Sequence, residues 1–351
     1  MEHDCGLEKA LEEIDKEIAE LVKKRASMLR GIDYSEALSI LTGRRSIVAD
    51  RISLEYGLPR DYALHLLALI DGVSLNLVKP LRVGFLGPRG SFTEEAALKM
   101  FGDMGATLVQ YQSIADVFRA VETGETDYGV VPLENSIEGS VGETLDMLAR
   151  TPTSICGETE VKISLCLIAR PGTKLSDIKT VLSHPMALAQ CRGFIYSKLR
   201  NVRIETRSST AEAVKEAVET PGIAAIGSEL AARIYCGEVL ARGLEDHREN
   251  YTRFIAIGFK PLDKGVDVKT SLIFTLEDVP GALYRALEPF AKRGINLSKI
   301  ESRPIKDRPW EYAFFVDISG SAEDPGVREA INELSSRATV VRILGSYRKI
   351  L

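Results

Sequence analysis

Short apolar runs alternate with amphipathic segments through the middle of this chain, between residues 81 and 259. The runs have the length and composition of buried strands, and the segments between them have the spacing of helices. An alternation of this kind predicts an open, largely parallel sheet with helices on both faces. An irregular β crossing near 155–165 suggests that the region forms two lobes with a cleft between them.

Different patterns flank this region, and 351 residues are too many for one ordinary domain. Apolar residues recur every three or four positions from Leu7 to Met28, which predicts a helical seam that faces another helix. We expect an all-α helical domain at 1–79 and a two-lobed, periplasmic-binding-protein-like α/β domain at 80–260. Residues 268–351 predict an α+β domain with the ferredoxin-like order βαββαβ.

Composition narrows the class of protein. The net charge of −5 and the lack of a basic tract give no reason to expect a nucleic acid or an anionic membrane as partner. The four histidines show no metal-ligand spacing, so we expect no metal site. The five cysteines form no CxxC pair, and the acidic start has no signal-peptide features. No apolar run approaches transmembrane length, and a cytoplasmic protein is predicted.

A hydroxyl and a guanidinium lie side by side at Thr252 and Arg253, where an apolar run predicts a strand. Strand ends are where α/β proteins place their chemistry. Arg253 can hold a carboxylate with two parallel hydrogen bonds, and Thr252 can donate one hydrogen bond to a second group nearby. The pair predicts a site for an anionic substrate with a leaving hydroxyl. The alternative is a strand with a surface Thr–Arg pair.

Two polar junctions between a strand and a helix lie in the first predicted lobe. In Gly87–Thr93 the glycines let the backbone approach a ligand, and the helix start presents N–H groups to an anion. Ser91 and Thr93 add hydroxyls there, although either can instead cap the helix. The second junction, Pro132–Val141, carries Asn135 and Ser136, which can donate to a carboxylate.

Two similar junctions lie in the second predicted lobe, at Ser183–Cys191 and Ser208–Ala211. Ser209 is either a ligand-binding hydroxyl or a helix cap. We expect all four junctions to converge with Thr252 and Arg253 on one cleft.

Arg25 interrupts the apolar seam of the first helix. A charge at such a position is costly unless it is paired or faces a polar cavity. Two interpretations stay open: the stem packs while the head reaches solvent, or an anion pocket lies between the helices.

The ordered junctions resemble the signatures of the prephenate dehydratase family over residues 82–259. One difference is Met186, where the family usually has Gln, so a side-chain amide is absent there. The resemblance is carried by Gly87-Pro88…Gly90-Ser91-Phe92-Thr93, Pro132-Leu133-Glu134-Asn135-Ser136…Gly139, Ser183-His184-Pro185…Ala187-Leu188-Ala189-Gln190-Cys191 and Asn250-Tyr251-Thr252-Arg253-Phe254.

This resemblance implies the conversion of prephenate to phenylpyruvate, water and carbon dioxide without a cofactor. Thr252 would hydrogen-bond the leaving hydroxyl, and Arg253 would clamp a carboxylate. The role of His184 stays open between packing and acid–base chemistry, and so does the use of arogenate. The expected substrate-binding residues are Ser91, Thr93, Asn135, Ser136, Gly139, Ser209 and Phe254.

The C-terminal region resembles the regulatory ACT domain, which implies phenylalanine binding at a subunit interface. A helix start suits the carboxylate of the amino acid, and Glu301 could pair with its ammonium. Tyr284 stands where the family commonly has Val. The expected effector-binding residues are Gly281, Ala282, Leu283, Glu301, Ser302, Arg303 and Pro304.

The N-terminal helices loosely resemble the chorismate mutase domain of bifunctional P-proteins. Arg25 matches one active-site arginine of that family, and Arg44 or Arg45 matches a second. Other cations of the family pattern are missing, and the loop at 31–36 is acidic. The mutase must hold two carboxylates and stabilise charge on an ether oxygen, so its activity stays open while its fold is expected.

Oligomerisation is expected because the thin helical domain and the ACT domain each suggest a dimer contact, giving a homodimer or tetramer. A non-catalytic solute-binding or amino-acid-sensing protein with the same folds is the alternative function.

Overall fold

The computed structural model describes residues 2–32, 34–199, 201–262, 265–304 and 312–351. It consists of two compact units. The first contains Met1–Val83 with Met100–Leu108, and the second contains Gly84–Lys99 with Val109–Leu351. The three domain boundaries expected above stay predictions.

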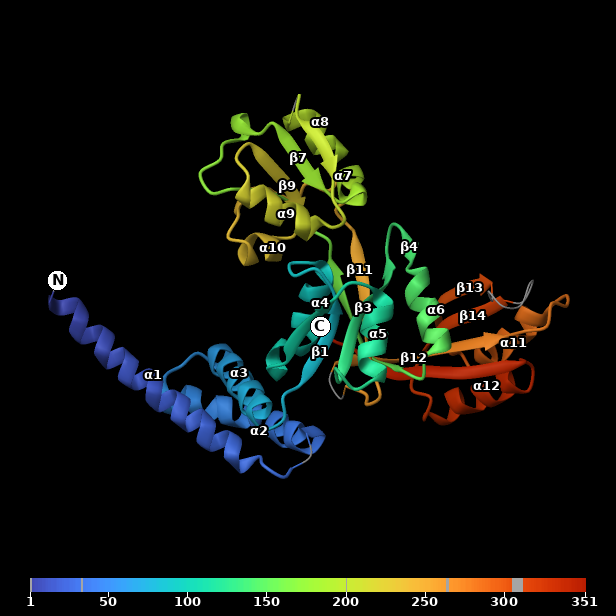
Figure 1. Cartoon of the computed structure of the whole chain (residues 1–351). Helices are drawn as coiled ribbons and strands as arrows, with labels where there is room; N and C mark the ends of the chain where they lie inside the picture. Colours follow the sequence, from blue (N-terminus) through green and yellow to red (C-terminus); the bar gives the residue numbers. More distant parts are fainter. Residues whose placement is uncertain (1, 33, 200, 263–264, 305–311) are drawn as a thin grey trace. The chain divides into compact units, whose positions relative to one another are not determined.

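Three helices form the N-terminal region, as predicted: α1 (Glu2–Met28), α2 (Tyr34–Tyr56) and α3 (Arg60–Val78). Helix α3 packs on both α1 and α2 (Figure 1). Their shared core is small and includes Leu29, Ala37, Leu41 and Leu75. The apolar face of α1 is not covered by it, because Leu11, Ile14 and Ile18 each keep about half of their surface exposed, at 51–52%.

Helix α3 corrects the expectation that no apolar run approaches transmembrane length. By length and composition it could cross a membrane. It also carries the buried carboxylate of Asp71, which is paired with Arg25 and Arg45 of the two other helices. A core helix of a helical bundle meets the same length and composition test.

The first lobe has a sheet in the order β5-β11-β3-β1-β2. Strands β1 and β2 run parallel, because hydrogen bonds join their starts and their ends. Thr107 N donates to Leu81 O at the start of the two strands, and Gly87 N donates to Tyr111 O at their end. The elements are β1 (Arg82–Leu86), α4 (Phe92–Phe101), η1 (Gly102–Met104), β2 (Thr107–Tyr111), α5 (Ile114–Glu122), β3 (Tyr128–Asn135), β4 (Gly139–Ser140), α6 (Gly142–Arg150), β5 (Ser154–Lys162) and β11 (Tyr251–Gly258).

The second lobe has its own sheet in the order β10-β6-β9-β7-β8. Helix α9 packs on β6, β7 and β9 of this sheet. The elements are β6 (Cys166–Ala169), η2 (Leu175–Asp177), β7 (Thr180–Ser183), α7 (Pro185–Gln190), α8 (Arg192–Lys198), β8 (Arg203–Thr206), α9 (Thr210–Glu219), β9 (Ile223–Gly227), α10 (Glu229–Ile234) and β10 (Glu238–Arg242).

The prediction of two α/β lobes is confirmed, but both sheets are mixed rather than largely parallel. In the first lobe β11 is antiparallel to β3 and to β5. In the second lobe β6 is antiparallel to β9 and to β10. The cause is the chain path: it leaves the first lobe after β5, enters the second at β6, and returns from β10 to β11.

The C-terminal domain has the predicted βαββαβ order. Its elements are β12 (Val266–Thr275), α11 (Ala282–Lys292), β13 (Leu297–Pro304), β14 (Tyr312–Ser319), α12 (Pro325–Ser335) and β15 (Val340–Lys349). The strand order is β13-β14-β12-β15, with β14–β13, β12–β14 and β12–β15 all antiparallel. Both helices contribute to one core with the sheet, so they cover the same face (Figure 1).

The sequence did not predict that this sheet is continuous with the first lobe. Strand β15 pairs with β5, with Lys349 opposite Glu158. Ile350 N donates to Glu158 O at 2.7 Å, and Thr159 Oγ1 donates to Ile350 O at 2.7 Å. The C-terminal strand therefore connects the regulatory-type domain to the strand next to β11.

Candidate active site

Thr252 lies on β11 where the two connections between the lobes run side by side. In the antiparallel registers it stands opposite Asn135 of β3 and Val161 of β5. Ile163 N donates to Asn250 O at 2.8 Å just beyond, so the two crossing segments are hydrogen-bonded to each other. The hydroxyl of Thr252 is thus fixed to the hinge of the two lobes, and the residue is 9% exposed.

Asn135 contacts Thr252 directly. Its Nδ2 donates to Thr252 Oγ1 at 2.9 Å and to Asn250 Oδ1 at 2.8 Å. Its Oδ1 accepts from the backbone N–H groups of Ile137 at 2.9 Å and Glu138 at 3.0 Å. The amide therefore has protein partners on both sides, and its predicted contact with a substrate carboxylate stays a prediction.

The same polar cluster reaches the second lobe. Asn250, which is 1% exposed, donates from Nδ2 to Oε1 of Gln190 on α7 at 3.2 Å. Gln190 belongs to the Ser183–Cys191 junction, so two of the four predicted junctions meet Thr252 through amide side chains.

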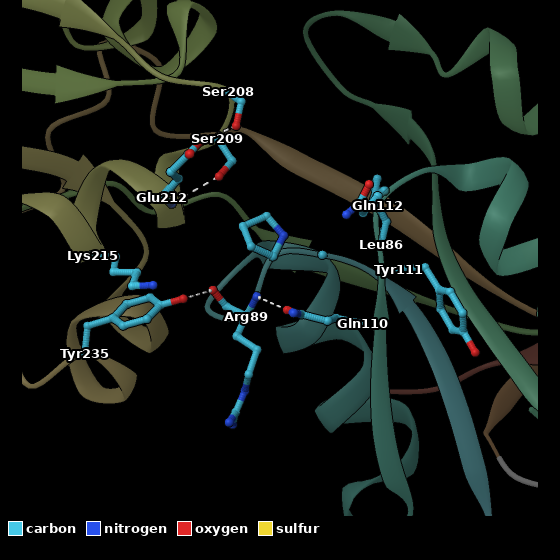
Figure 2. Close-up of a pocket in the computed structure, with 12 residues that line it drawn as sticks. Leu86, Arg89, Gln110, Tyr111, Gln112, Ser208, Ser209, Glu212, Lys215 and Tyr235 are labelled. Atoms are coloured by element: carbon cyan, nitrogen blue, oxygen red, sulfur yellow. Dashed lines mark hydrogen bonds between the residues drawn. The ribbon is translucent and has the colours of Figure 1, made fainter.

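The two other junctions line a cavity of about 790 Å³ between the lobes (Figure 2). From the first lobe come the loop after β1 and the end of β2. From the second lobe come the start of α9 and Tyr235. The lining residues are Leu86, Gly87, Pro88, Arg89, Gln110, Tyr111, Gln112, Ser208, Ser209, Glu212, Lys215 and Tyr235.

The loop after β1 is packed against the second lobe. Gly90 has φ +82°, and a Cβ there would lie 2.9 Å from the Cα and Cβ atoms of Ala231. Ser228 Oγ donates to Gly90 O at 2.7 Å, and Tyr235 Oη donates to Arg89 O at 3.0 Å. Glycine is required at position 90 because both the left-handed backbone and the close approach exclude a side chain.

Sequence reasoning missed the cation that this cavity offers. Figure 2 shows Lys215 of α9 beside Tyr235, whereas the side chain of Arg89 runs away from Ser208 and Ser209. Among the residues that the structure describes, Lys215 forms no ion pair. The sequence held one signal for Lys215: it lies about one helical turn after the polar Ser208–Ala211 junction, because α9 begins at Thr210.

Several predicted binding residues have structural roles in the chain. Ser91 Oγ accepts from Glu94 N at 3.2 Å, as the capping alternative expected. Glu94 itself accepts from Gly90 N at 2.5 Å, so a carboxylate of the protein already occupies this helix start. Thr93 and Phe254 are buried at 6% and 2% exposure, and neither lines the cavity.

The remaining predicted residues lie either at the cavity or near the amide cluster around Thr252. Ser209 lines the cavity and also caps α9, accepting from Glu212 N at 3.1 Å. Ser136 Oγ accepts from Tyr251 N at 3.0 Å beside the amide cluster, and Gly139 is exposed with φ +83°. His184 Nδ1 accepts from Met186 N at 3.3 Å, and the residue is the N-cap of α7.

Arg253 differs most from its predicted role. Successive side chains of a strand point to opposite faces, so Arg253 faces away from Thr252. Its guanidinium donates to Glu158 Oε2 at 2.5 Å, to Asp317 Oδ2 at 2.6 Å and to Tyr347 Oη at 2.9 Å. In this structure the guanidinium is thus engaged by Glu158 of β5 and by the C-terminal domain, and its predicted clamp on a substrate carboxylate stays a prediction.

This ion-pair network is buried and balanced in charge. The side chains of Arg253, Glu158 and Asp317 are 11%, 4% and 6% exposed. Lys269 Nζ lies 2.7 Å from Glu158 Oε1. Glu134 Oε2 lies 3.7 Å from Arg253 Nη1 and 3.0 Å from Lys299 Nζ, so three cations meet three carboxylates. Burial alone would lower the pKa of Arg253, but Tyr347 and the carboxylates of Asp317 and Glu158 hold this pKa above its ordinary value. Burial, with the Asp317 charge, raises the pKa of Tyr347, so its hydroxyl stays protonated.

A second cavity, of about 210 Å³, lies in the C-terminal domain at the start of α11. Gly281 has φ +79° and is the N-cap of that helix, so a side chain there would be strained. Ala282 and Leu283 line the cavity as well, together with the acidic side chains of Glu277 and Asp278.

The other half of the predicted effector site lies elsewhere in the chain. Glu301 Oε2 accepts from Ser140 Oγ at 3.1 Å, and Arg303 Nη2 donates to Asp146 Oδ1 at 3.1 Å. Ser302 and Pro304 belong to the same strand, β13, and line no part of this cavity. Within one chain, Glu301 is thus bound to the first lobe rather than aimed at the cavity.

The predicted mutase arginines converge on one carboxylate in the helical region. Arg25 donates to Asp71 Oδ1 and, at 3.1 Å, to Ser74 Oγ. Arg45 Nε donates to Asp71 Oδ2 at 3.0 Å, whereas Arg44 is exposed. Arg25 is therefore paired in the interior rather than directed to solvent.

Fold and site together define a two-lobed enzyme for a small anionic substrate, with a helical region before it and a regulatory-type domain after it. The prephenate dehydratase family matches residues 83–261, and the ACT domain matches residues 270–336. The bifunctional chorismate mutase/prephenate dehydratase of Aquifex aeolicus (strain VF5) is 39% identical over 361 residues, covering 100% of this chain and 99% of that protein. The chain belongs to the prephenate dehydratase family.

Two solved structures extend the comparison. The prephenate dehydratase of Arthrobacter aurescens in complex with L-Phe has a TM-score of 0.70 at 38% identity, covering 76% of this chain and 90% of that chain. GqqA, described as a novel type of quorum quenching acylase, has a TM-score of 0.69 at 30% identity, covering 76% and 98%. The fold is thus shared by proteins with different described activities, and the site must decide between them.

We predict that Arg253→Ala mainly lowers stability. It leaves two buried carboxylates short of a partner, and breaking a buried ion pair costs about 3–5 kcal/mol. Urea or thermal unfolding of the full chain measures the loss. The control is Arg242→Ala, which removes an exposed ion pair with Glu229 and should change stability by less than about 1 kcal/mol. If the Arg253→Ala protein unfolds like the wild type but has a higher KM, the result would instead support the prediction that Arg253 binds a carboxylate of the substrate.

Proposed function

We propose that this protein converts prephenate to phenylpyruvate, water and carbon dioxide in phenylalanine biosynthesis, in the cytosol. The observation that carries the proposal is the Thr252 hydroxyl at the hinge of two lobes that enclose a polar cavity. Membership of the dehydratase family, with the ordered junctions intact, supports the same reaction.

The reaction breaks two bonds of the ring. The bond from carbon to the ring hydroxyl breaks as the hydroxyl leaves, and the bond to the ring carboxylate breaks as carbon dioxide leaves with its electron pair remaining in the ring. The ring becomes aromatic, which supplies the driving force. Thr252 hydrogen-bonds the leaving oxygen; because an aliphatic hydroxyl is a weak acid, it polarises the bond rather than transferring a free proton. The oxygen leaves as hydroxide and takes one proton from solvent to become water.

Two carboxylates of the substrate need partners as well. Thr252 is not among the residues that line the 790 Å³ cavity, so the proposal needs a substrate that reaches from this cavity to the Thr252 hydroxyl. With Arg253 engaged elsewhere, Lys215 is the cation that we assign to one of them, assisted by the hydroxyls of Ser208 and Ser209. The amides of Gln110 and Gln112 complete the polar lining from the first lobe. Closure of the lobes would exclude water and strengthen these contacts.

We predict that Thr252→Ala lowers kcat about a hundredfold or more, because one hydrogen bond made in the transition state is worth about 3 kcal/mol. Phenylpyruvate formation, followed by absorbance, measures it. Thr252→Ser keeps the hydroxyl and is the matched control, which should retain most of the turnover. Near-normal turnover in the alanine variant would refute the role of Thr252, and a wild-type protein that leaves prephenate unchanged would refute the function.

We also propose that phenylalanine regulates the enzyme through the cavity at the start of α11. The helix start suits the carboxylate, and Glu277 or Asp278 suits the ammonium. Because Glu301 to Pro304 lie away from this cavity in one chain, their predicted role requires the ACT domain of a second copy. The exposed apolar face of α1 likewise suits a second copy, which supports a homodimer or a dimer of dimers.

We predict that Ala282→Trp, which fills this cavity, weakens phenylalanine binding at least about tenfold, equivalent to about 1.4 kcal/mol. Isothermal titration calorimetry of the full chain measures it. Ala291→Trp is the matched control, since Ala291 is exposed near the other end of the same helix and should bind as the wild type does. Equal binding by both variants would place the effector elsewhere.

For the helical region we propose chorismate mutase activity, supported by the name and full coverage of the Aquifex relative and by the meeting of Arg25 with Arg45. Asp71 competes with a dicarboxylate for these cations, so the substrate must displace it.

We predict that Arg25→Gln lowers chorismate consumption about a hundredfold, the value of one charge-stabilising donor, while dehydratase turnover is kept. Arg51→Ala, an exposed arginine of α2, is the control. A wild-type protein that does not consume chorismate would show that the helical region is not a mutase.

A further inference from the structure

We propose that Asn135 is a positioning residue of the dehydratase reaction: it holds the Thr252 hydroxyl so that its proton points to the substrate. This inference rests on the proposed function and deepens it. It assigns Asn135 a role through Thr252 rather than through contact with a substrate carboxylate.

The orientation of the Asn135 amide is fixed by groups that can only donate. The backbone N–H groups of Ile137 and Glu138 lie 2.9 and 3.0 Å from its Oδ1. An amide NH₂ in that place would face two N–H donors, so the oxygen must occupy it. The Nδ2 atom is therefore directed to the opposite side, toward Thr252.

The orientation of the Asn135 amide decides the direction of the next hydrogen bond. Asn135 Nδ2 has two N–H groups, which only donate, and its two nearest acceptors are Asn250 Oδ1 at 2.8 Å and Thr252 Oγ1 at 2.9 Å. The backbone oxygen of Tyr251 is more distant, at 3.3 Å. Thr252 Oγ1 is thus the acceptor, and its own proton stays available. Among the residues that the structure describes, Thr252 Oγ1 donates no hydrogen bond. The hydroxyl is held as a donor before any substrate binds, which avoids reorganisation during the reaction.

The second lobe supports the same arrangement. Asn250 Oδ1 accepts from Asn135 Nδ2 at 2.8 Å, and Asn250 Nδ2 donates to Gln190 Oε1 at 3.2 Å. A continuous series of amides therefore links α7 of the second lobe to Thr252. Asn135 donates outward to both Thr252 and Asn250, and Asn250 donates onward to Gln190. Since Asn250 is 1% exposed, water does not compete for the Asn250 amide at the centre of the series.

The decisive variants are Asn135→Asp and Asn135→Ala. Aspartate has nearly the same shape and keeps the acceptor for the two backbone N–H groups, but its second oxygen accepts the Thr252 proton and turns the hydroxyl away from the substrate. Alanine removes the partner and leaves the hydroxyl free to rotate, so a fraction still donates. A merely structural role predicts the reverse order, with the isosteric aspartate milder than alanine.

The measurement is kcat and KM of the full chain for these variants, alone and combined with Thr252→Ala, with thermal unfolding as the check on folding. We expect kcat to fall about a hundredfold in Asn135→Asp, as in Thr252→Ala, and about tenfold in Asn135→Ala. In the Thr252→Ala background, Asn135→Asp should lower kcat no further, because residues that act as a unit are not additive.

The proposal is overturned if Asn135→Asp keeps more turnover than Asn135→Ala, or if it lowers kcat by the same factor with and without the Thr252 hydroxyl. Either result, in a wild-type protein that turns over prephenate, leaves the proposed function standing. A wild-type protein without dehydratase turnover removes both.

Discussion

A β-strand sends neighbouring side chains to opposite faces, and on β11 this constraint decides what two adjacent residues can do. Thr252 turns toward the hinge between the lobes, where Asn135 donates to its hydroxyl. Arg253 turns toward the C-terminal domain and pairs with Asp317. One strand therefore carries both the hydroxyl that we propose for the leaving group and the guanidinium that connects the first lobe to the ACT domain.

That connection gives regulation a physical basis. The ACT sheet and the sheet of the first lobe are joined through β15 and β5, and the Arg253 network crosses the same junction. A buried guanidinium with two carboxylate partners resists displacement, since separating them leaves charge unpaired in a poor solvent. A shift of the ACT sheet would thus be transmitted to β11, one residue from Thr252, without a long chain of intermediates.

Much of the architecture was predictable, because helical and strand periodicities are local properties of the sequence. Three helices, two α/β lobes and the βαββαβ domain all followed from them. The antiparallel return of β11 and the pairing of β15 with β5 did not, since these are contacts between segments far apart in the chain. The opposite directions of Thr252 and Arg253 could have been read from the strand prediction itself. The turn in which the side chain of Asn135 accepts from the backbone N–H groups of Ile137 and Glu138 could also have been predicted, because Asn side chains commonly form such local turns. Lys215 could not, because only the folded α9 brings it to the cavity.

The central claim is that Thr252, and not Arg253, meets the reacting part of the substrate. A crystal structure of the full-length Thr252→Ala protein with bound prephenate tests it most directly. We expect the ring hydroxyl of prephenate beside position 252, with the guanidinium of Arg253 still bound to Glu158 and Asp317. A substrate carboxylate bound to Arg253, with those two ion pairs broken, would contradict it.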